Sequence, residues 1–149
     1  MKIKINELEQ TKKLAEKIAK LVESTDIIEL NGDLGSGKTT FAKFFINSLL
    51  TKNEEVLSPT FNLVHQYEAK DFTIWHFDLY RLENEREAEE IGIYDAFEEG
   101  VSLIEWPQII SGIVPENRLL IIFTSNEGCR EVTITPHGFW QNKLKKLQL

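Results

Sequence analysis

The sequence contains a single cysteine, Cys129, so an internal disulfide and a metal site built from several thiolates are both excluded. It contains no run of about 18 or more apolar residues, and the segment Met1–Asn6 lacks the apolar core of a signal peptide. These absences lead us to expect a cytoplasmic protein that does not cross a membrane.

Basic residues are too few and too scattered to form a face that grips a nucleic-acid backbone. The chain has 17 lysine and arginine residues against 24 aspartate and glutamate residues, which gives a formal net charge of −7. We therefore expect no tight direct binding to DNA or RNA. Residues 83–99 alone contain eight acidic residues and one arginine. This acidic stretch is either a surface that meets a basic protein partner or a solvated helix face.

The length of 149 residues and the apolar content of 42% are those of one ordinary domain, spanning residues 1–149. Strand-like and helix-like patterns alternate through the middle of the chain, and two pairs of strands are joined by short turns. Strands are predicted at residues 2–5, 27–30, 61–67, 72–77, 101–104, 118–123 and 131–135, and helices at residues 6–22, 40–50 and through the acidic stretch. The pattern predicts an α/β fold in three layers, with a mixed, mainly parallel sheet covered on both faces and antiparallel hairpins.

A phosphate-binding loop is the clearest motif. Residues Gly32–Thr39 fit the pattern G-x-x-x-x-G-K-[ST], with a predicted strand before them and a predicted helix after them. The glycines let successive backbone N–H groups face an anion, and the positive end of the helix adds to the attraction. We expect Lys38 to reach the β- and γ-phosphates of a nucleotide and the Thr39 hydroxyl to bind Mg²⁺. The motif predicts a P-loop NTPase-like fold.

A magnesium-phosphate site also needs a carboxylate at the end of a nearby strand. Glu105 ends the short apolar run Val-Ser-Leu-Ile, a pattern typical of a buried parallel strand, and it is the favoured metal carboxylate. Asp78 ends a second run. We expect it either to support the metal ligands without binding the metal directly or to lie beside the attacking water. The alternative for either residue is a helix cap or a surface ion pair.

Two further polar features lie near these strands. Thr60, in the loop Ser58-Pro59-Thr60, has the position of a residue that senses the γ-phosphate, although an ordinary turn explains the same residues. His76 precedes Asp78 by two residues and therefore shares its strand face. We interpret His76 as a packed structural residue rather than a catalytic base, because no serine or cysteine is arranged with it as in a triad.

Five segments in this order resemble one protein family, the bacterial tRNA threonylcarbamoyladenosine biosynthesis ATPase family, TsaE. They are residues 32–40, S-P-T-F at 58–61, H-F-D-L-Y-R-L at 76–82, G-I-Y at 92–94 and L-I-E-W-P at 103–107. The phosphate loop alone is unspecific, whereas D-L-Y-R-L and I-E-W-P at these intervals are specific. The resemblance covers most of residues 1–125.

The resemblance implies a small cytoplasmic protein that binds and slowly hydrolyses ATP with Mg²⁺. It implies action beside two partner subunits, TsaB and TsaD, which transfer the threonylcarbamoyl group to tRNA. In this family the ATPase supports turnover of the partner complex and does not catalyse the transfer. Contact with tRNA is accordingly expected through the complex, and neither DNA nor a membrane is an expected partner.

Residue by residue, the resemblance assigns catalytic roles to Lys38, Thr60, Asp78 and Glu105, and metal binding to Thr39 and Glu105. It assigns nucleotide binding to Asp33, Leu34, Gly35, Ser36, Gly37, Lys38, Thr39, Thr40, Thr11, Trp106 and Arg130. In this assignment, Thr11 and Arg130 would contact the adenine side of the nucleotide. The chain departs from the family pattern after about residue 125, where Arg130 follows Gly128-Cys129.

Two other functions stay open on the sequence. A small-molecule kinase needs a lid and a clamp for its acceptor, and we find neither a lid-like insertion nor an arginine cluster. A nucleotide-dependent binding module would use ATP only to order residues 58–61 and the acidic stretch. A GTPase is not expected, because the guanine-reading N-K-x-D element is absent. The presence of only four arginines favours an ATPase that is slow until partners complete its site.

Overall fold

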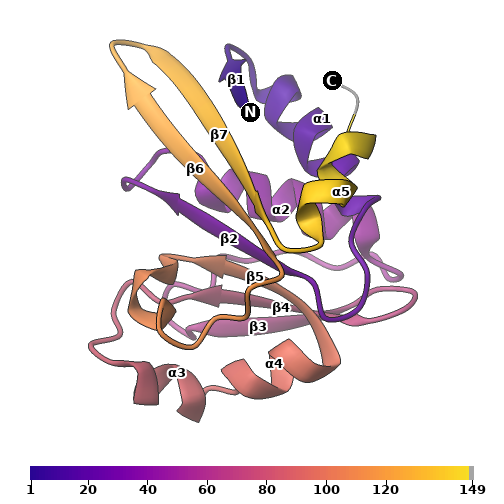
Figure 1. Cartoon of the computed structure of the whole chain (residues 1–149), viewed down its shortest axis with the longest axis vertical. Coiled ribbons are helices and arrows are strands. Elements are labelled where there is room, and N and C mark those ends of the chain that lie inside the picture. The colour runs from indigo at the N-terminus through magenta and orange to yellow at the C-terminus, as the bar shows by residue number, and fades with distance from the viewer. Residues whose placement is uncertain (148–149) are drawn as a thin grey trace.

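The computed structural model describes residues 1–147, in which seven strands form one sheet in the order β1-β7-β6-β2-β5-β4-β3 (Figure 1). The strands are β1 (Lys2–Ile5), β2 (Ile27–Gly32), β3 (Val64–Glu68), β4 (Thr73–Asp78), β5 (Gly100–Glu105), β6 (Arg118–Asn126) and β7 (Cys129–His137). The central strands β6, β2, β5 and β4 are mutually parallel. The remaining strands pair antiparallel, as β3–β4, β6–β7 and β1–β7. The prediction of a mixed, mainly parallel sheet with antiparallel hairpins is confirmed for the core of the sheet, where the four central strands are parallel.

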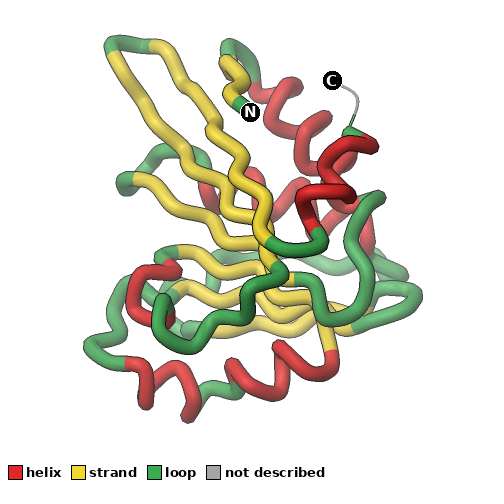
Figure 2. Tube along the Cα trace, viewed as in Figure 1, coloured by secondary structure: helices red, strands yellow, loops and turns green. Residues whose placement is uncertain are grey.

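Helices lie on both faces of this sheet (Figures 1 and 2). On one face are α1 (Leu8–Ala19), α2 (Lys38–Leu49) and the short α5 (Trp140–Lys143); on the other are α3 (Glu85–Glu90), α4 (Ile93–Glu99) and the 3₁₀ turn Pro107–Ile110. Side chains alternate along each strand, so Ile28 and Leu30 enter the core under α1 and α2 while Ile27 enters the core under α3 and α4. The covering is uneven, because Leu120 and Ile122 on β6 are only half-buried.

Several element boundaries differ from those predicted. Strand β3 begins at Val64 and not at residue 61, because Leu63 takes a left-handed conformation (φ 68°) and its N–H donates to the Pro59 carbonyl at 2.6 Å. The acidic stretch forms two helices with Gly92 between them at φ 96°, a value that favours glycine. Helix α1 ends at Ala19, before the predicted residue 22. The longer loop before β3 brings Thr60 beside the end of β4.

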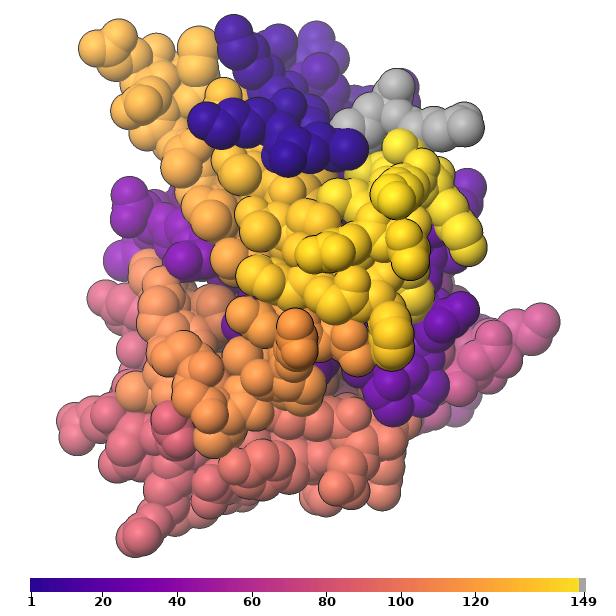
Figure 3. Space-filling model, in the orientation of Figure 1, coloured from indigo at the N-terminus to yellow at the C-terminus, as the bar shows by residue number. Residues whose placement is uncertain are grey.

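The C-terminal segment folds back onto the sheet, which the sequence analysis did not anticipate. Trp140, Leu144 and Leu147 are buried in the same core as α1 and α2. Lys143 forms ion pairs with Asp26 and with Glu23, the latter at 3.3 Å. The space-filling view shows this segment as a continuous surface beside the N-terminal residues (Figure 3). Within residues 1–147, no helix is long and apolar enough to cross a membrane.

Candidate functional site

The phosphate loop joins the carboxyl end of β2 to the first residue of α2. Gly35 and Gly37 have φ values of 74° and 113°, which side-chain-bearing residues rarely adopt. At Gly32 a Cβ atom would lie 2.5 Å from the Phe123 carbonyl oxygen, so this position also requires glycine. Among the described residues 1–147, no side chain caps the first turn of α2. Its backbone N–H groups are therefore available for an anion, as a phosphate site requires.

Lys38 is folded back over the loop and its side chain is almost completely buried. Its Nζ donates to the carbonyl oxygens of Gly32 at 2.6 Å and Asp33 at 2.8 Å, and it lies 4.2 Å from the centroid of the Trp106 ring. Burial lowers the pKa of Lys38, and the charges of Glu105 and Asp78 act in the opposite direction. The Lys38 ammonium group therefore lies beside the loop and, within residues 1–147, forms no ion pair with a carboxylate.

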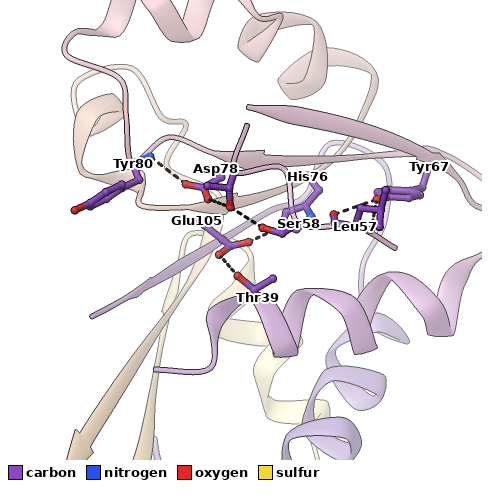
Figure 4. A network of polar contacts seen from close by, with 9 residues as sticks. Thr39, Leu57, Ser58, Tyr67, His76, Asp78, Tyr80 and Glu105 are labelled. Atoms are coloured by element: carbon purple, nitrogen blue, oxygen red, sulfur yellow. Dashed lines mark hydrogen bonds and ion pairs between the residues drawn. The ribbon is translucent and has the colours of Figure 1, made fainter. Parts of the chain in front are cut away.

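Asp78 and Glu105 lie at the carboxyl ends of the adjacent parallel strands β4 and β5, directly opposite each other in register. Both side chains are buried, and both project toward α2. The Thr39 hydroxyl donates to Glu105 Oε1 at 2.7 Å (Figure 4). A hydroxyl and a carboxylate next to a phosphate loop are the protein ligands that Mg²⁺ takes together with nucleotide phosphates and water. These residues fit a magnesium site.

Asp78 is held by a different set of donors. Its Oδ2 accepts from the Thr60 hydroxyl at 3.3 Å and its Oδ1 from the Tyr80 backbone N–H at 3.1 Å. The Thr60 and Ser58 hydroxyls are themselves 2.7 Å apart. The same loop is attached to β3 through the Tyr67 hydroxyl, which lies 3.2 Å from the Leu57 N (Figure 4). The loop that carries Thr60 is thereby fastened at the end of β4.

These groups surround one cavity of about 240 Å³. Its lining consists of Leu34, Gly35, Gly37, Lys38, Thr39, Thr40, Thr60, Asp78, Tyr80, Glu105, Trp106 and Arg130. Of the residues that the sequence assigned to the site, Asp33 and Ser36 lie next to Lys38 without lining the cavity, the latter with its Oγ 3.4 Å from Nζ. Thr11 is buried in α1 and is not among these lining residues. Its assignment to the adenine side stays a prediction.

Two residues have a place in the site that the sequence analysis did not give them. The Tyr80 ring lies 4.7 Å from that of Trp106, centroid to centroid, and lines the cavity. Its position two residues after Asp78 is the only signal that could have indicated this. His76, interpreted as a packing residue, is indeed fully buried, but its Nε2 lies 2.6 Å from Glu105 Oε2.

The combination of phosphate loop, paired carboxylates and aromatic residues matches a known family. A family model described as threonylcarbamoyl adenosine biosynthesis protein TsaE matches residues 5–132. The chain belongs to the TsaE family. It is thus a member of a family of tRNA threonylcarbamoyladenosine biosynthesis proteins, and the resemblance noted in the sequence is confirmed.

Individual TsaE proteins are similar over most of the chain. The protein from Rickettsia conorii is 44% identical over 110 residues, which cover 74% of this chain and 63% of that protein. The protein from Bacillus subtilis is 38% identical over 133 residues, which cover 87% of this chain and 82% of that protein. Both are described as tRNA threonylcarbamoyladenosine biosynthesis protein TsaE.

A solved structure shares the fold. The crystal structure of YdiB from Bacillus subtilis superposes with a TM-score of 0.78 at 30% sequence identity, and the match covers 98% of this chain and 91% of that one. The agreement therefore extends over the whole sheet and both helical layers.

Proposed function

We propose that this TsaE-family chain is a Mg²⁺-dependent ATPase that supports tRNA threonylcarbamoyladenosine modification by acting on a complex of TsaB and TsaD. The observation that carries the proposal is the 2.7 Å contact between Thr39 of the phosphate loop and Glu105 at the end of β5. A glycine-rich turn that merely began a helix would need neither a hydroxyl nor a buried carboxylate at these two places. A phosphate loop that binds a metal nucleotide needs both.

The groups around the cavity divide the work of binding and hydrolysis. The loop N–H groups and the Lys38 ammonium bind the phosphates, and Thr39 with Glu105 would hold Mg²⁺, which supplies positive charge to the β- and γ-oxygens. Asp78 is fixed by Thr60 and the Tyr80 N–H, and one of its remaining lone pairs can accept a proton from an attacking water. The Trp106 and Tyr80 rings lie next to each other in the lining of the cavity.

The distribution of the arginines supports a slow reaction in the isolated chain. Arg118, the first residue of β6, pairs with Glu29 of β2 at 2.9 Å, Arg81 lies 4.8 Å from the centroid of the Phe61 ring, and Arg86 is exposed on α3. Arg130 alone lines the cavity, and it is the residue that the resemblance assigns to the adenine side. The chain therefore has no second arginine to stabilise charge on the γ-phosphate, and a partner could provide it.

Hydrolysis rates with and without TsaB and TsaD test this proposal. We expect slow turnover by the chain alone and faster turnover when both partners are present. Equal, fast rates under the two conditions would refute the partner dependence. Transfer of the γ-phosphate to a metabolite in a substrate screen would favour a small-molecule kinase instead.

A further inference from the structure

The Glu105 carboxylate is held at both of its oxygens. Thr39 Oγ1 lies 2.7 Å from Oε1, and His76 Nε2 lies 2.6 Å from Oε2 (Figure 4). The exposed fractions of the His76 and Glu105 side chains are 0% and 2%. The histidine therefore contacts the candidate metal carboxylate from within the protein, and it is not part of the cavity lining.

The register of the sheet explains this contact. His76 lies opposite Leu103 in the β4–β5 pair, and Asp78 lies opposite Glu105. Since side chains alternate along a strand, His76, Asp78 and Glu105 all project to the α2 face. His76 is two residues deeper in the sheet than Asp78. Its ring reaches Glu105 diagonally, from the side away from the cavity.

The two ring nitrogens of His76 have different surroundings. Nδ1 is buried and has no hydrogen-bond partner within residues 1–147. A carboxylate oxygen accepts hydrogen bonds, so Nε2 donates to Glu105 Oε2 and is the one polar atom of the ring that is engaged within the described residues. A donor held at Oε2 fixes the orientation of the carboxylate and keeps Oε1 on the Thr39 side.

We propose that His76 is a positioning residue that keeps Glu105 Oε1 beside Thr39 and so sets the affinity of the site for the metal–nucleotide complex. This inference rests on the proposed ATPase function. A histidine that served only for packing could be replaced by an apolar residue of similar size without changing metal binding. A positioning histidine can be replaced only by a side chain that donates a hydrogen bond from the same place.

Three variants and one control separate these roles. His76→Gln carries an amide N–H near the position of Nε2, His76→Leu has no donor, and His76→Asn has the same amide but one methylene less reach. The control is His65→Leu, because His65 is the cross-strand partner of His76 on β3 but, within residues 1–147, makes no hydrogen bond to Glu105 and is not part of the cavity lining. Unfolding curves establish that each variant folds.

Two binding measurements give the readout. The first is the affinity for a fluorescent ATP analogue without metal, and the second is the affinity of the protein–ATP complex for Mn²⁺, followed by electron paramagnetic resonance. For His76→Leu we expect unchanged metal-free nucleotide affinity and Mn²⁺ binding weakened by about 10–100-fold, the usual loss when a group supporting a metal ligand is removed. His76→Asn should show the same loss. His76→Gln should recover most of the affinity, and His65→Leu should match the wild type.

Contrary results would identify which part is wrong. Wild-type Mn²⁺ affinity in His76→Leu, or in His76→Asn if the leucine variant does not fold, would overturn the positioning role and leave the proposed function intact. An equal loss in the glutamine and asparagine variants would also overturn it, because reach would then be irrelevant. A wild-type chain without metal-dependent nucleotide binding would overturn the proposed function itself, and the positioning role with it.

Discussion

Asp78 and Glu105 are opposite each other in register at the ends of β4 and β5, yet they bond to different loops. Glu105 accepts from Thr39 of the phosphate loop, whereas Asp78 accepts from Thr60 of the loop before β3. The two carboxylates are therefore positioned by different parts of the chain. This difference predicts different consequences when each is neutralised.

Replacing Glu105 by glutamine should act on metal binding. The substitution removes the negative charge that faces Thr39 while keeping the side-chain volume. We expect the Mg²⁺ concentration needed for half-maximal nucleotide binding to rise by at least the roughly 10–100-fold that follows loss of a supporting group. A magnesium titration of nucleotide affinity measures this, and an unchanged midpoint would rule out Glu105 as the metal carboxylate.

Replacing Asp78 by asparagine should act on the chemical step. Since Asp78 does not contact Thr39, nucleotide affinity in the presence of Mg²⁺ should stay near that of the wild type. Loss of a proton acceptor should slow hydrolysis by about 10²–10⁴-fold. Single-turnover hydrolysis is the measurement. If this variant also sustains tRNA modification by TsaB and TsaD over many turnovers, the chain acts as a nucleotide-dependent binding module and hydrolysis is incidental.

Replacing Lys38 by alanine should weaken nucleotide binding on the order of 100-fold, because hydrogen bonds to charged groups contribute about 1.5–3 kcal/mol and no other lysine lines the cavity. Hydrolysis should become undetectable. Lys43→Ala, an exposed position in the same helix, is the matched control. Calorimetric titration with an ATP analogue compares the two, and equal affinities would contradict the site assignment.

The buried ion pair between Glu29 and Arg118 gives a pH prediction. Burial raises the pKa of Glu29 above its ordinary value of 4.5, and Arg118 only partly opposes this effect. A raised pKa in the folded state means that stability is favoured at low pH and lost as the pH rises through the folded-state pKa. The free energy of unfolding of the wild type, relative to Glu29→Gln, should therefore fall from pH 4.5 toward neutrality. Parallel urea titrations across this range would show a pH-independent difference if the prediction is wrong.

The acidic surface on α3 and α4 should affect the rate of association with a basic partner. Glu90, Glu98 and Glu99 are exposed and make no side-chain hydrogen bond or ion pair within residues 1–147, unlike Glu87, which accepts from the Glu83 N–H. Reversing these three residues to lysine should slow association and reduce its dependence on salt. Reversal of Glu9, Glu55 and Asp71 changes the net charge equally and is the control. Stopped-flow mixing with TsaB–TsaD measures the association rate. If both sets of reversals change this rate equally, the acidic stretch is a solvated helix face and not a docking surface.

The parts of the site that depend on local chemistry could be predicted from the sequence. The glycine spacing of the phosphate loop and the carboxylates that end two apolar runs are properties of neighbouring residues, and the structure brings Lys38, Thr39, Asp78 and Glu105 to one cavity. The contact of His76 with Glu105 depends on which strands are neighbours and on their register. Neither is encoded within a short segment.

The misplaced boundaries have similar causes. Residues 61–63 have the composition of a strand, but a left-handed turn at Leu63 is stabilised by its hydrogen bond to Pro59 and by the bond from the Asp78 N–H to the Leu63 carbonyl at 2.9 Å. The C-terminal segment has apolar residues at 140, 144 and 147, which is helical spacing. Its lysines nevertheless give the segment the composition of a solvated tail. Only the folded structure shows that these apolar residues pack onto the core beneath the segment.

The C-terminal segment shows that the family model and the hydrophobic core end at different residues. The family model ends at residue 132, whereas Trp140 and Leu144 fill the core beside α1 and α2. The hydrophobic core therefore extends past the residues that the model matches. A chimera that transplanted residues 5–132 alone into a relative would need a replacement for these buried apolar side chains, and without one the hydrophobic interior would be open to water beside the sheet that carries the candidate site.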